Sequence, residues 1–264
     1  MPSSIRIRRF FVRPLALVSA LIWGCGYYLI PARFEPFDAE LQAEPGAAAT
    51  MAVFDDGTVA YVLDRLEVSV RPMTDAELNR QFPSFSKDGG GPAAPLPTNP
   101  FTFGDWTDPR TGRSPQRFSV FKISVKNYEY PKLKFDPLEV TIESGNGRTY
   151  YPWGNFDFKE YFRRFAPAHS GLGKMRFNER QDMINHTKYP DDEFVFSGQT
   201  VEGFIVFEKI HDDVREIAFH IPNVGTRYDF RSEPVETVDL VYRFKRDLHK
   251  VRTYDELATQ VANP

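Results

Sequence analysis

Apolar and polar residues alternate along several short stretches beyond residue 50, a pattern typical of β-strands with one buried and one exposed face. Residues 66–71 show it first, where leucine and valine alternate with polar side chains. The same period of two recurs at three later places: Leu138, Val140 and Ile142; Ile217, Phe219 and Ile221; and Val238, Leu240, Tyr242 and Phe244. We expect these apolar residues to line a common core.

Two further apolar runs depart from simple alternation. Residues 118–125 keep the period of two except for a slip at Phe121, which predicts a β-bulge there. The run from Phe204 to Phe207 is apolar on both faces, as expected of a central strand, and Phe207 should point into the core. Gly203, just before that run, allows a neighbouring segment to approach closely.

Turn signals separate these runs. Asp55-Asp56-Gly57-Thr58 joins residues 51–54 to residues 59–70 and predicts a hairpin, and residues 144–147 mark a second turn. About eight short strands with turn-rich connections indicate an all-β fold, a sandwich built from residues 51–250.

Two insertions interrupt this pattern. Residues 82–116 contain seven prolines, five glycines and five large aromatic residues, with neither helical nor strand periodicity. Residues 153–196 are partly helical: an aromatic stripe at Phe158, Tyr161, Phe162 and Phe165 has helical spacing and should pack on the sandwich. A second helix is expected to start at a capping box formed by Asn178 and Gln181 and to end near Thr187.

The amino-terminal 33 residues predict the location of the chain. Four arginines precede residues 14–32, which carry no charge and would span about 28 Å as a helix, close to the thickness of a bilayer. We expect residues 1–33 to be a signal or membrane anchor, with the rest of the chain outside the cytoplasm. Three fates stay open: an uncleaved membrane helix, lipidation at Cys25, or cleavage. Residues 34–50 then form a spacer, and residues 251–264 a tail.

Charge and cysteine content exclude several classes. The net charge is −3, and without residues 1–33, which hold five arginines and no acid, it is −8, so we expect no nucleic-acid partner. With Cys25 as the single cysteine, the chain can form no intrachain disulfide and no four-sulfur zinc site.

Candidate chemistry is sparse. The five histidines lack metal-ligand spacing, so we assign no metal site, no cofactor and no catalytic residue. Two acidic runs, residues 191–193 and 211–213, have oxygen ligands suited to calcium, although solvated turn carboxylates are the simpler interpretation.

Three segments together carry a resemblance to a known family: Phe118–Asn127, then Leu138–Tyr150 with its Gly-Asn-Gly turn, then Ser197–Phe207. In this order they resemble the bacterial exported immunoglobulin-like domains of a family of unknown function that is common on lipoproteins. The resemblance extends over about residues 59–221. It implies an immunoglobulin-like sandwich, and it brings no catalytic residues.

These observations lead to two functional hypotheses. The first is a non-catalytic, membrane-tethered β-sandwich, periplasmic or on the cell surface, that binds or scaffolds another envelope protein. Its contact residues would be Phe101, Phe103 and Trp106, because exposed aromatic side chains concentrate binding energy; alternatively, these rings simply pack on the domain. The second hypothesis is an accessory or hydrolytic enzyme with its site in the 153–196 insertion.

Overall fold

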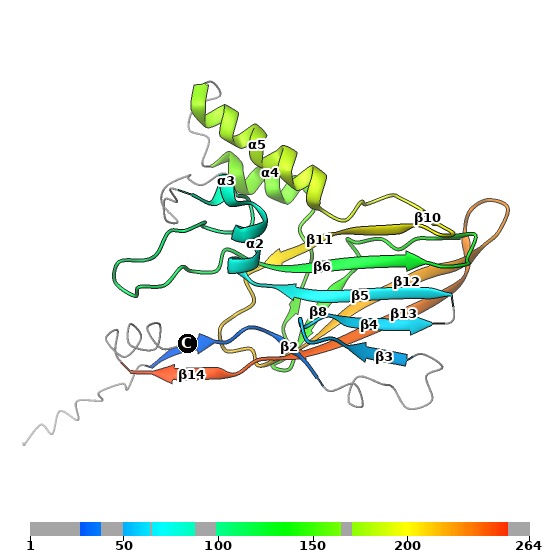
Figure 1. Ribbon diagram of the computed structural model, residues 1–264, viewed down its shortest axis with the longest axis horizontal. Coiled ribbons are helices and arrows are strands. Elements are labelled where there is room, and N and C mark those ends of the chain that lie inside the picture. Colours follow the sequence, from blue (N-terminus) through cyan, green and yellow to red (C-terminus); the bar gives the residue numbers. More distant parts are fainter. Residues whose placement is uncertain (1–26, 38–49, 64, 88–98, 165–170, 253–264) are drawn as a thin grey trace, which may run out of the picture.

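The computed structural model describes residues 27–37, 50–63, 65–87, 99–164 and 171–252, which form a mostly β fold (Figure 1). The first of two five-stranded antiparallel sheets has the order β11-β6-β5-β4-β3. Its strands are β3 (Thr50–Val53), β4 (Val59–Leu63), β5 (Leu66–Met73), β6 (Phe118–Asn127) and β11 (Thr200–Glu208). The second sheet has the order β2-β13-β12-β8-β9. Its strands are β2 (Glu35–Pro36), β8 (Thr141–Ser144), β9 (Thr149–Tyr150), β12 (Glu216–Tyr228) and β13 (Pro234–Lys245).

The main core lies between the two sheets and gives the fold a sandwich-like form. Alternating residues of both sheets contribute to it, so the predicted alternation of β5, β12 and β13 is confirmed. Phe121, Phe207 and Phe219 meet at its centre, with ring centroids 5.0 to 5.8 Å apart. All three are at most 1% exposed, which confirms the inward orientation expected for Phe207 and Phe219.

A helical layer covers one end of the outer face of the first sheet (Figure 1). It contains α2 (Asp75–Gln81), α3 (Pro83–Ser86), α4 (Asn155–Arg163) and α5 (Gly171–Thr187). A second apolar cluster fills the space between these helices and the sheet: Met73, Leu78, Phe101, Phe118, Val120, Phe158, Phe162, Ile184, Phe204 and Val206. The expected packing of Phe158 and Phe162 on the sandwich is confirmed.

This layer corrects two predictions about the strands beneath it. β6 pairs with β5 and β11 without a register shift, so the break at Phe121 is not a bulge. Val120 faces the helices while Phe121 faces the sandwich core, and both are apolar because both faces are buried. For the same reason β11 is apolar on both faces, although it lies at the edge of its sheet rather than at the centre.

Two short segments cover the outer edge of β11. The Trp153 amide donates to the Val206 carbonyl at 2.7 Å, and the Tyr189 amide donates to the Phe204 carbonyl at 2.9 Å. The close approach predicted at Gly203 is confirmed, because a Cβ at that position would lie 2.4 Å from the Tyr189 backbone. A further pair, β7 (Lys132–Leu133) with β10 (Val195–Phe196), extends this edge.

Several predicted boundaries were wrong. The run 59–70 contains two strands rather than one, since β4 folds back on β5 with Leu63 opposite Leu66. Leu138 is 45% exposed, and β8 begins only at Thr141. Helix α5 starts at Gly171, so Asn178 lies within the helix and does not cap it. The turns at residues 55–58 and 144–147 are confirmed.

The amino-terminal region also differs from its predicted division. β1 (Tyr28–Pro31) pairs with β14 (Leu248–Val251), so the last residues of the expected membrane span belong to a strand. Phe34 packs against the core and β2 joins β13, which places these spacer residues within the domain. Residues 1–26, including Cys25, lie outside the described part of the chain. Within the described part, no helix has the length and apolar character needed to span a bilayer.

Candidate functional site

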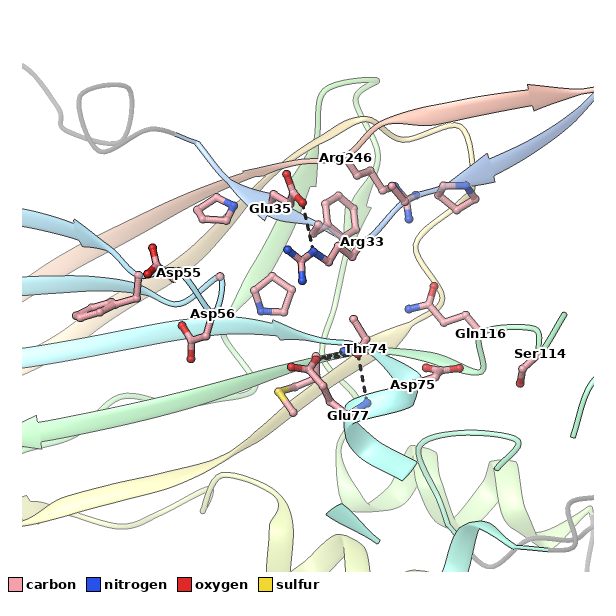
Figure 2. A pocket seen from close by; sticks show the side chains of 18 residues that line it. Arg33, Glu35, Asp55, Asp56, Thr74, Asp75, Glu77, Ser114, Gln116 and Arg246 are labelled. Carbon is pink, nitrogen blue, oxygen red and sulfur yellow. Dashed lines mark hydrogen bonds and ion pairs between the residues drawn. The ribbon is translucent and has the colours of Figure 1, made fainter. Parts of the chain in front are cut away.

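An open groove of about 520 Å³ lies where the two sheets meet the start of the helical layer (Figure 2). Its walls come from four segments that are far apart in the sequence. They are residues 31–36 between β1 and β2, the turn 54–57, residues 72–77 at the end of β5 and the start of α2, and residues 114–116. Arg246, just after β13, completes the lining.

Carboxylates dominate the polar lining: Glu35, Asp55, Asp56, Asp75 and Glu77 (Figure 2). Three of them are engaged within the chain. Glu35 pairs with Arg33 at 3.3 Å, and Asp56 pairs with Arg71 at 3.2 Å. Glu77 accepts a hydrogen bond from the Thr74 amide at 2.8 Å and so caps helix α2. Among the described residues, Asp55 and Asp75 have no hydrogen-bond or ion-pair partner, which leaves two carboxylates available to a cationic ligand.

Asp75 has an unusual electrostatic environment. Burial raises the pKa of its carboxyl to about 7, while the charges of Arg117 and Lys209 oppose that rise. Burial dominates because neither cation forms a direct ion pair with the carboxyl. Asp75 therefore changes its charge near neutral pH, and a cation bound in the groove would favour its ionised form.

Arg246 holds one wall of the groove in place. Its Nε donates to the Val214 carbonyl at 2.7 Å and its Nη2 to the His211 carbonyl at 2.5 Å, and burial lowers the pKa of this guanidinium. The guanidinium carbon lies 4.4 Å from the centre of the Phe34 ring, which is part of the groove wall. The wall is thus fixed to the loop 209–215 through one buried side chain.

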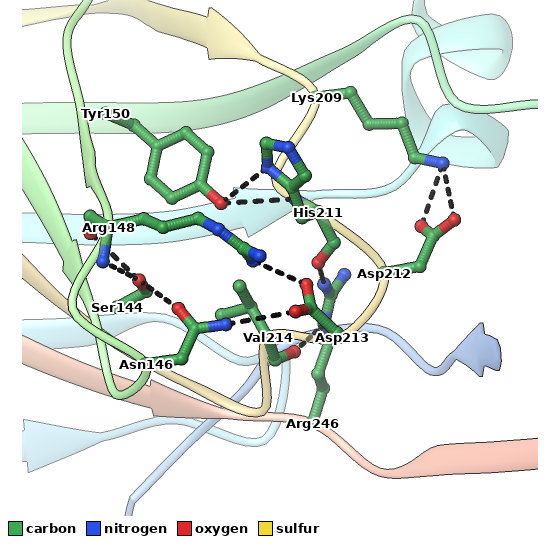
Figure 3. A network of polar contacts seen from close by, with 10 residues as sticks. All are labelled: Ser144, Asn146, Arg148, Tyr150, Lys209, His211, Asp212, Asp213, Val214 and Arg246. Carbon is green, nitrogen blue, oxygen red and sulfur yellow. Dashed lines mark hydrogen bonds and ion pairs between the residues drawn. The ribbon is translucent and has the colours of Figure 1, made fainter.

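The polar network around that loop uses the acidic run 211–213 (Figure 3). Asp213 pairs with Arg148 at 2.6 Å, and Asp212 pairs with Lys209 at 2.8 Å. The Tyr150 hydroxyl lies 2.9 Å from Nδ1 of His211. These contacts give the carboxylates of Asp212 and Asp213 structural partners.

The other acidic run is engaged in the same way, since Asp191 pairs with Lys188 at 2.6 Å and Asp192 pairs with Lys134. In the described ranges, no three histidine, cysteine or carboxylate side chains gather in a metal-ligating group.

The polar lining of the groove is mainly acidic. Its lining contains five carboxylates, the guanidinium groups of Arg33 and Arg246, the hydroxyls of Thr74 and Ser114 and the Gln116 amide, but no histidine, lysine or cysteine. A carboxyl with a pKa near neutral can exchange a proton with a ligand in the groove. What the lining offers directly is negative charge and hydrogen-bond acceptors.

Comparisons with known proteins give only distant matches. No protein-family model and no curated protein matches the sequence. Among solved structures, the secreted protein MPT63 from Mycobacterium tuberculosis is 8% identical, with a TM-score of 0.27 over 74% of this chain and 91% of its own. A functionally unknown protein from Listeria monocytogenes EGD-e is 10% identical, with a TM-score of 0.30 over 83% of this chain and 88% of its own.

None of the three aromatic residues expected to dock onto a partner lines the groove, and Phe101 lies under the helical layer. Phe101 is 0% and Phe103 is 6% exposed, while Trp106 is half-buried. Phe101 packs edge-on against Phe204, with ring centroids 5.4 Å apart. The burial of Phe101 and Phe103 agrees with the alternative expectation, in which these rings pack on the domain. The physical reason is that the apolar residues at this end of the first sheet must be shielded from water. Only Trp106 keeps a partly exposed surface.

The 153–196 insertion, the expected location of an enzymatic site, uses its acids for structure. Asp157 accepts a hydrogen bond from the Gly154 amide at 2.8 Å, and Glu160 pairs with Arg163 at 3.0 Å. Asp182 lies 3.4 Å from His186 on the exposed face of α5. Asp182, together with Glu179, lines an open hollow on α5.

Sequence reasoning missed the groove because its four segments and Arg246 are brought together only by the fold. Two local signals were present. One is the Asp-Gly turn that carries Asp55 and Asp56, and the other is the pattern Thr74-x-x-Glu77, a capping box that places Asp75 in the first turn of α2. Neither signal shows that the two segments face each other.

Proposed function

We propose that this chain is a membrane-tethered, extracytoplasmic module with an immunoglobulin-like sandwich that binds a basic, extended segment of another envelope protein. The observation that carries the proposal is the open groove with five carboxylates, of which Asp55 and Asp75 have no hydrogen-bond or ion-pair partner among the described residues. Its volume of about 520 Å³ falls within the range of ligand sites, which is roughly 300 to 1,000 Å³.

The negative charge of the groove favours a partner with positively charged side chains. Lysine or arginine side chains entering the groove would meet Asp55 on one wall and Asp75 on the opposite wall. Electrostatic complementarity of this kind speeds encounter and disfavours acidic partners, more than it adds affinity at an exposed site. The affinity then depends on contact with the apolar part of the lining, which includes Phe34, Phe54 and Met73.

The tether remains part of the proposal and has a geometric consequence. If residues 1–26 anchor the chain, by a membrane segment or by a lipid on Cys25, the groove wall begins five residues later, at Pro31. Five or six extended residues span roughly 20 Å. The groove would therefore lie close to the bilayer surface, where the partner would be another membrane-associated protein.

Affinity purification with matched variants tests this function. The full-length chain and an Asp55→Asn/Asp75→Asn variant would be purified from detergent-solubilised membranes and compared by quantitative mass spectrometry. A Glu193→Gln/Glu208→Gln variant removes two exposed acids outside the groove and serves as the control. We expect one envelope protein to be depleted only in the groove variant. Equal recovery with all three chains would contradict the proposal.

A further inference from the structure

The outer edge of β13 is open along most of its length. β2 pairs with this edge only at Phe244 and Lys245, which lie at one end of a strand that begins at Pro234. Among the described residues, no strand pairs with residues 235–242 on that side. An open sheet edge presents backbone N–H and C=O groups to which another strand can bind.

Neighbouring hydrogen bonds show which residues of β13 direct their backbone groups outward. The Arg243 carbonyl accepts a hydrogen bond from the Phe37 amide at 3.1 Å, on the outer side. The Glu236 carbonyl accepts one from the Thr226 hydroxyl at 3.3 Å, on the side of β12. Between residues 236 and 245 the register shifts place their extra residues on β12, so the alternation along β13 is unbroken. The backbone groups of residues 237, 239 and 241 therefore point to the open edge.

This part of the edge is accessible and has little protection against pairing. Thr237 and Asp239 are exposed, and Val235 is 54% exposed. Proteins commonly blunt an edge strand with lysine, with proline or by making the strand very short. Residues 235–241 contain neither lysine nor proline, and β13 is 12 residues long.

The sequence of the edge is complementary to itself in antiparallel pairing. With Val238 on a two-fold axis, Thr237 of each copy would lie opposite Asp239 of the other copy, where its hydroxyl can donate to the carboxylate. The next pair would bring Val241 opposite Val235. With Asp239 on the axis instead, two carboxylates would lie opposite each other, which is unfavourable.

We propose that β13 is the pairing strand of a two-fold symmetric dimer, in which the second sheets of two copies join edge to edge. One strand paired with its copy buries less area than a standard interface, so the dimer is reversible, with a dissociation constant on the order of 10 μM. No residue from 234 to 245 lines the acidic groove, so the dimer does not depend on the function proposed for the groove.

Sedimentation equilibrium of the full-length chain in non-ionic detergent, from about 2 to about 200 μM, tests the dimer. Thr237→Asp places a carboxylate opposite Asp239 in both symmetric pairs, so we expect dimerisation to weaken roughly tenfold. Thr237→Lys places a cation there and should strengthen dimerisation roughly threefold or more. Because position 237 is exposed, both variants should keep the Tm of the native chain. If the aspartate variant fails to fold, the opposite effect of lysine still decides.

Thr149→Asp and Thr149→Lys are the matched controls. Thr149 is exposed on β9, at the other border of the same sheet, and the two substitutions change the net charge by the same amounts. Neither should alter association. Effects of opposite sign at position 237 alone support pairing through β13. A chain that is monomeric at every concentration, or a dimer that responds equally or not at all at the two positions, would overturn the proposal and leave the edge to a strand of another protein.

Discussion

The hydroxyl of Tyr242 on β13 donates a hydrogen bond of 2.8 Å to the Val68 carbonyl on β5. The two residues belong to different sheets, so this bond crosses the core and joins the two layers directly. Tyr242 is 0% exposed, and burial raises the pKa of its phenol well above the ordinary value, which keeps the hydroxyl protonated as a donor. The bond fixes the relative position of the two sheets at one point of an otherwise apolar interface.

Tyr242→Phe removes the hydroxyl and keeps the ring. We expect the free energy of unfolding to fall by about 1 to 2 kcal/mol, because a buried carbonyl loses a partner. Urea unfolding measures the change, and Tyr151→Phe, at a ring that is 65% exposed, should leave stability within about 0.5 kcal/mol. Equal stability of the two variants would show that the bond contributes nothing.

Gly203→Ala tests the contact between β11 and the segment that covers its edge. The added Cβ would lie 2.4 Å from both the amide nitrogen and the Cα of Tyr189, and backbone cannot yield as a flexible side chain does. We expect a loss of about 2 kcal/mol or more, or failure to fold. Gly145→Ala is the control, since its Cβ would meet the nearest atom at an ordinary 3.5 Å. A stable Gly203→Ala variant would disprove the close packing.

Phe101→Ala and Trp106→Ala separate core packing from partner docking. Phe101 is fully buried in the second apolar cluster, so its truncation should cost about 3 to 5 kcal/mol and lower Tm markedly. Trp106 is only half-buried, and its truncation should cost clearly less. If the Phe101 variant instead kept its Tm, the loop would not belong to the core.

Asp75 gives a pH dependence with a defined sign. Its pKa is about 7 in the folded chain and 3.8 ordinarily, so between these values the folded state holds a proton that the unfolded state has lost. This group therefore lowers stability as pH rises from about 4 to 7. At pH 8 the free energy of unfolding of Asp75→Asn should exceed that of the native chain by about 1 to 3 kcal/mol, a range reduced to allow for the partial exposure of Asp75. Near pH 4 the two chains should be equally stable. A constant difference across this range would refute the raised pKa.

The two-sheet core was predictable, because β5, β12 and β13 each have one buried and one exposed face. The helical layer was harder to predict. It buries the outer face of β6 and β11, so apolar residues occur on both faces of these strands and the simple alternation is lost. Val120 and Phe121 look like a slip of register, but each is buried against a different layer. The spacing of apolar residues along a strand indicates only which faces of the strand are buried. A strand that is apolar on both faces can therefore be a central strand, or an edge strand whose outer face is packed against helices.

The site could not be predicted, because it is formed by tertiary contacts. Asp55 and Asp75 are twenty residues apart and share the groove only because β4 pairs with β3 and β5 pairs with β4, which brings the end of β5 beside the turn 54–57. The strand at Tyr28–Pro31 was also hidden, because its apolar residues continue the run expected for a membrane span. Its pairing with Leu248–Val251 joins the two ends of the described chain, and a local pattern cannot reveal that contact.

Site-specific photo-crosslinking in intact cells tests the groove most directly. A photoreactive amino acid replaces Phe54, which lines the groove and is 52% exposed, or Tyr151, which is 65% exposed and lies outside the groove. We predict one crosslinked envelope protein from position 54, its loss when Asp55→Asn and Asp75→Asn are added, and no such product from position 151. The same product from both positions, or none from position 54, would contradict the account.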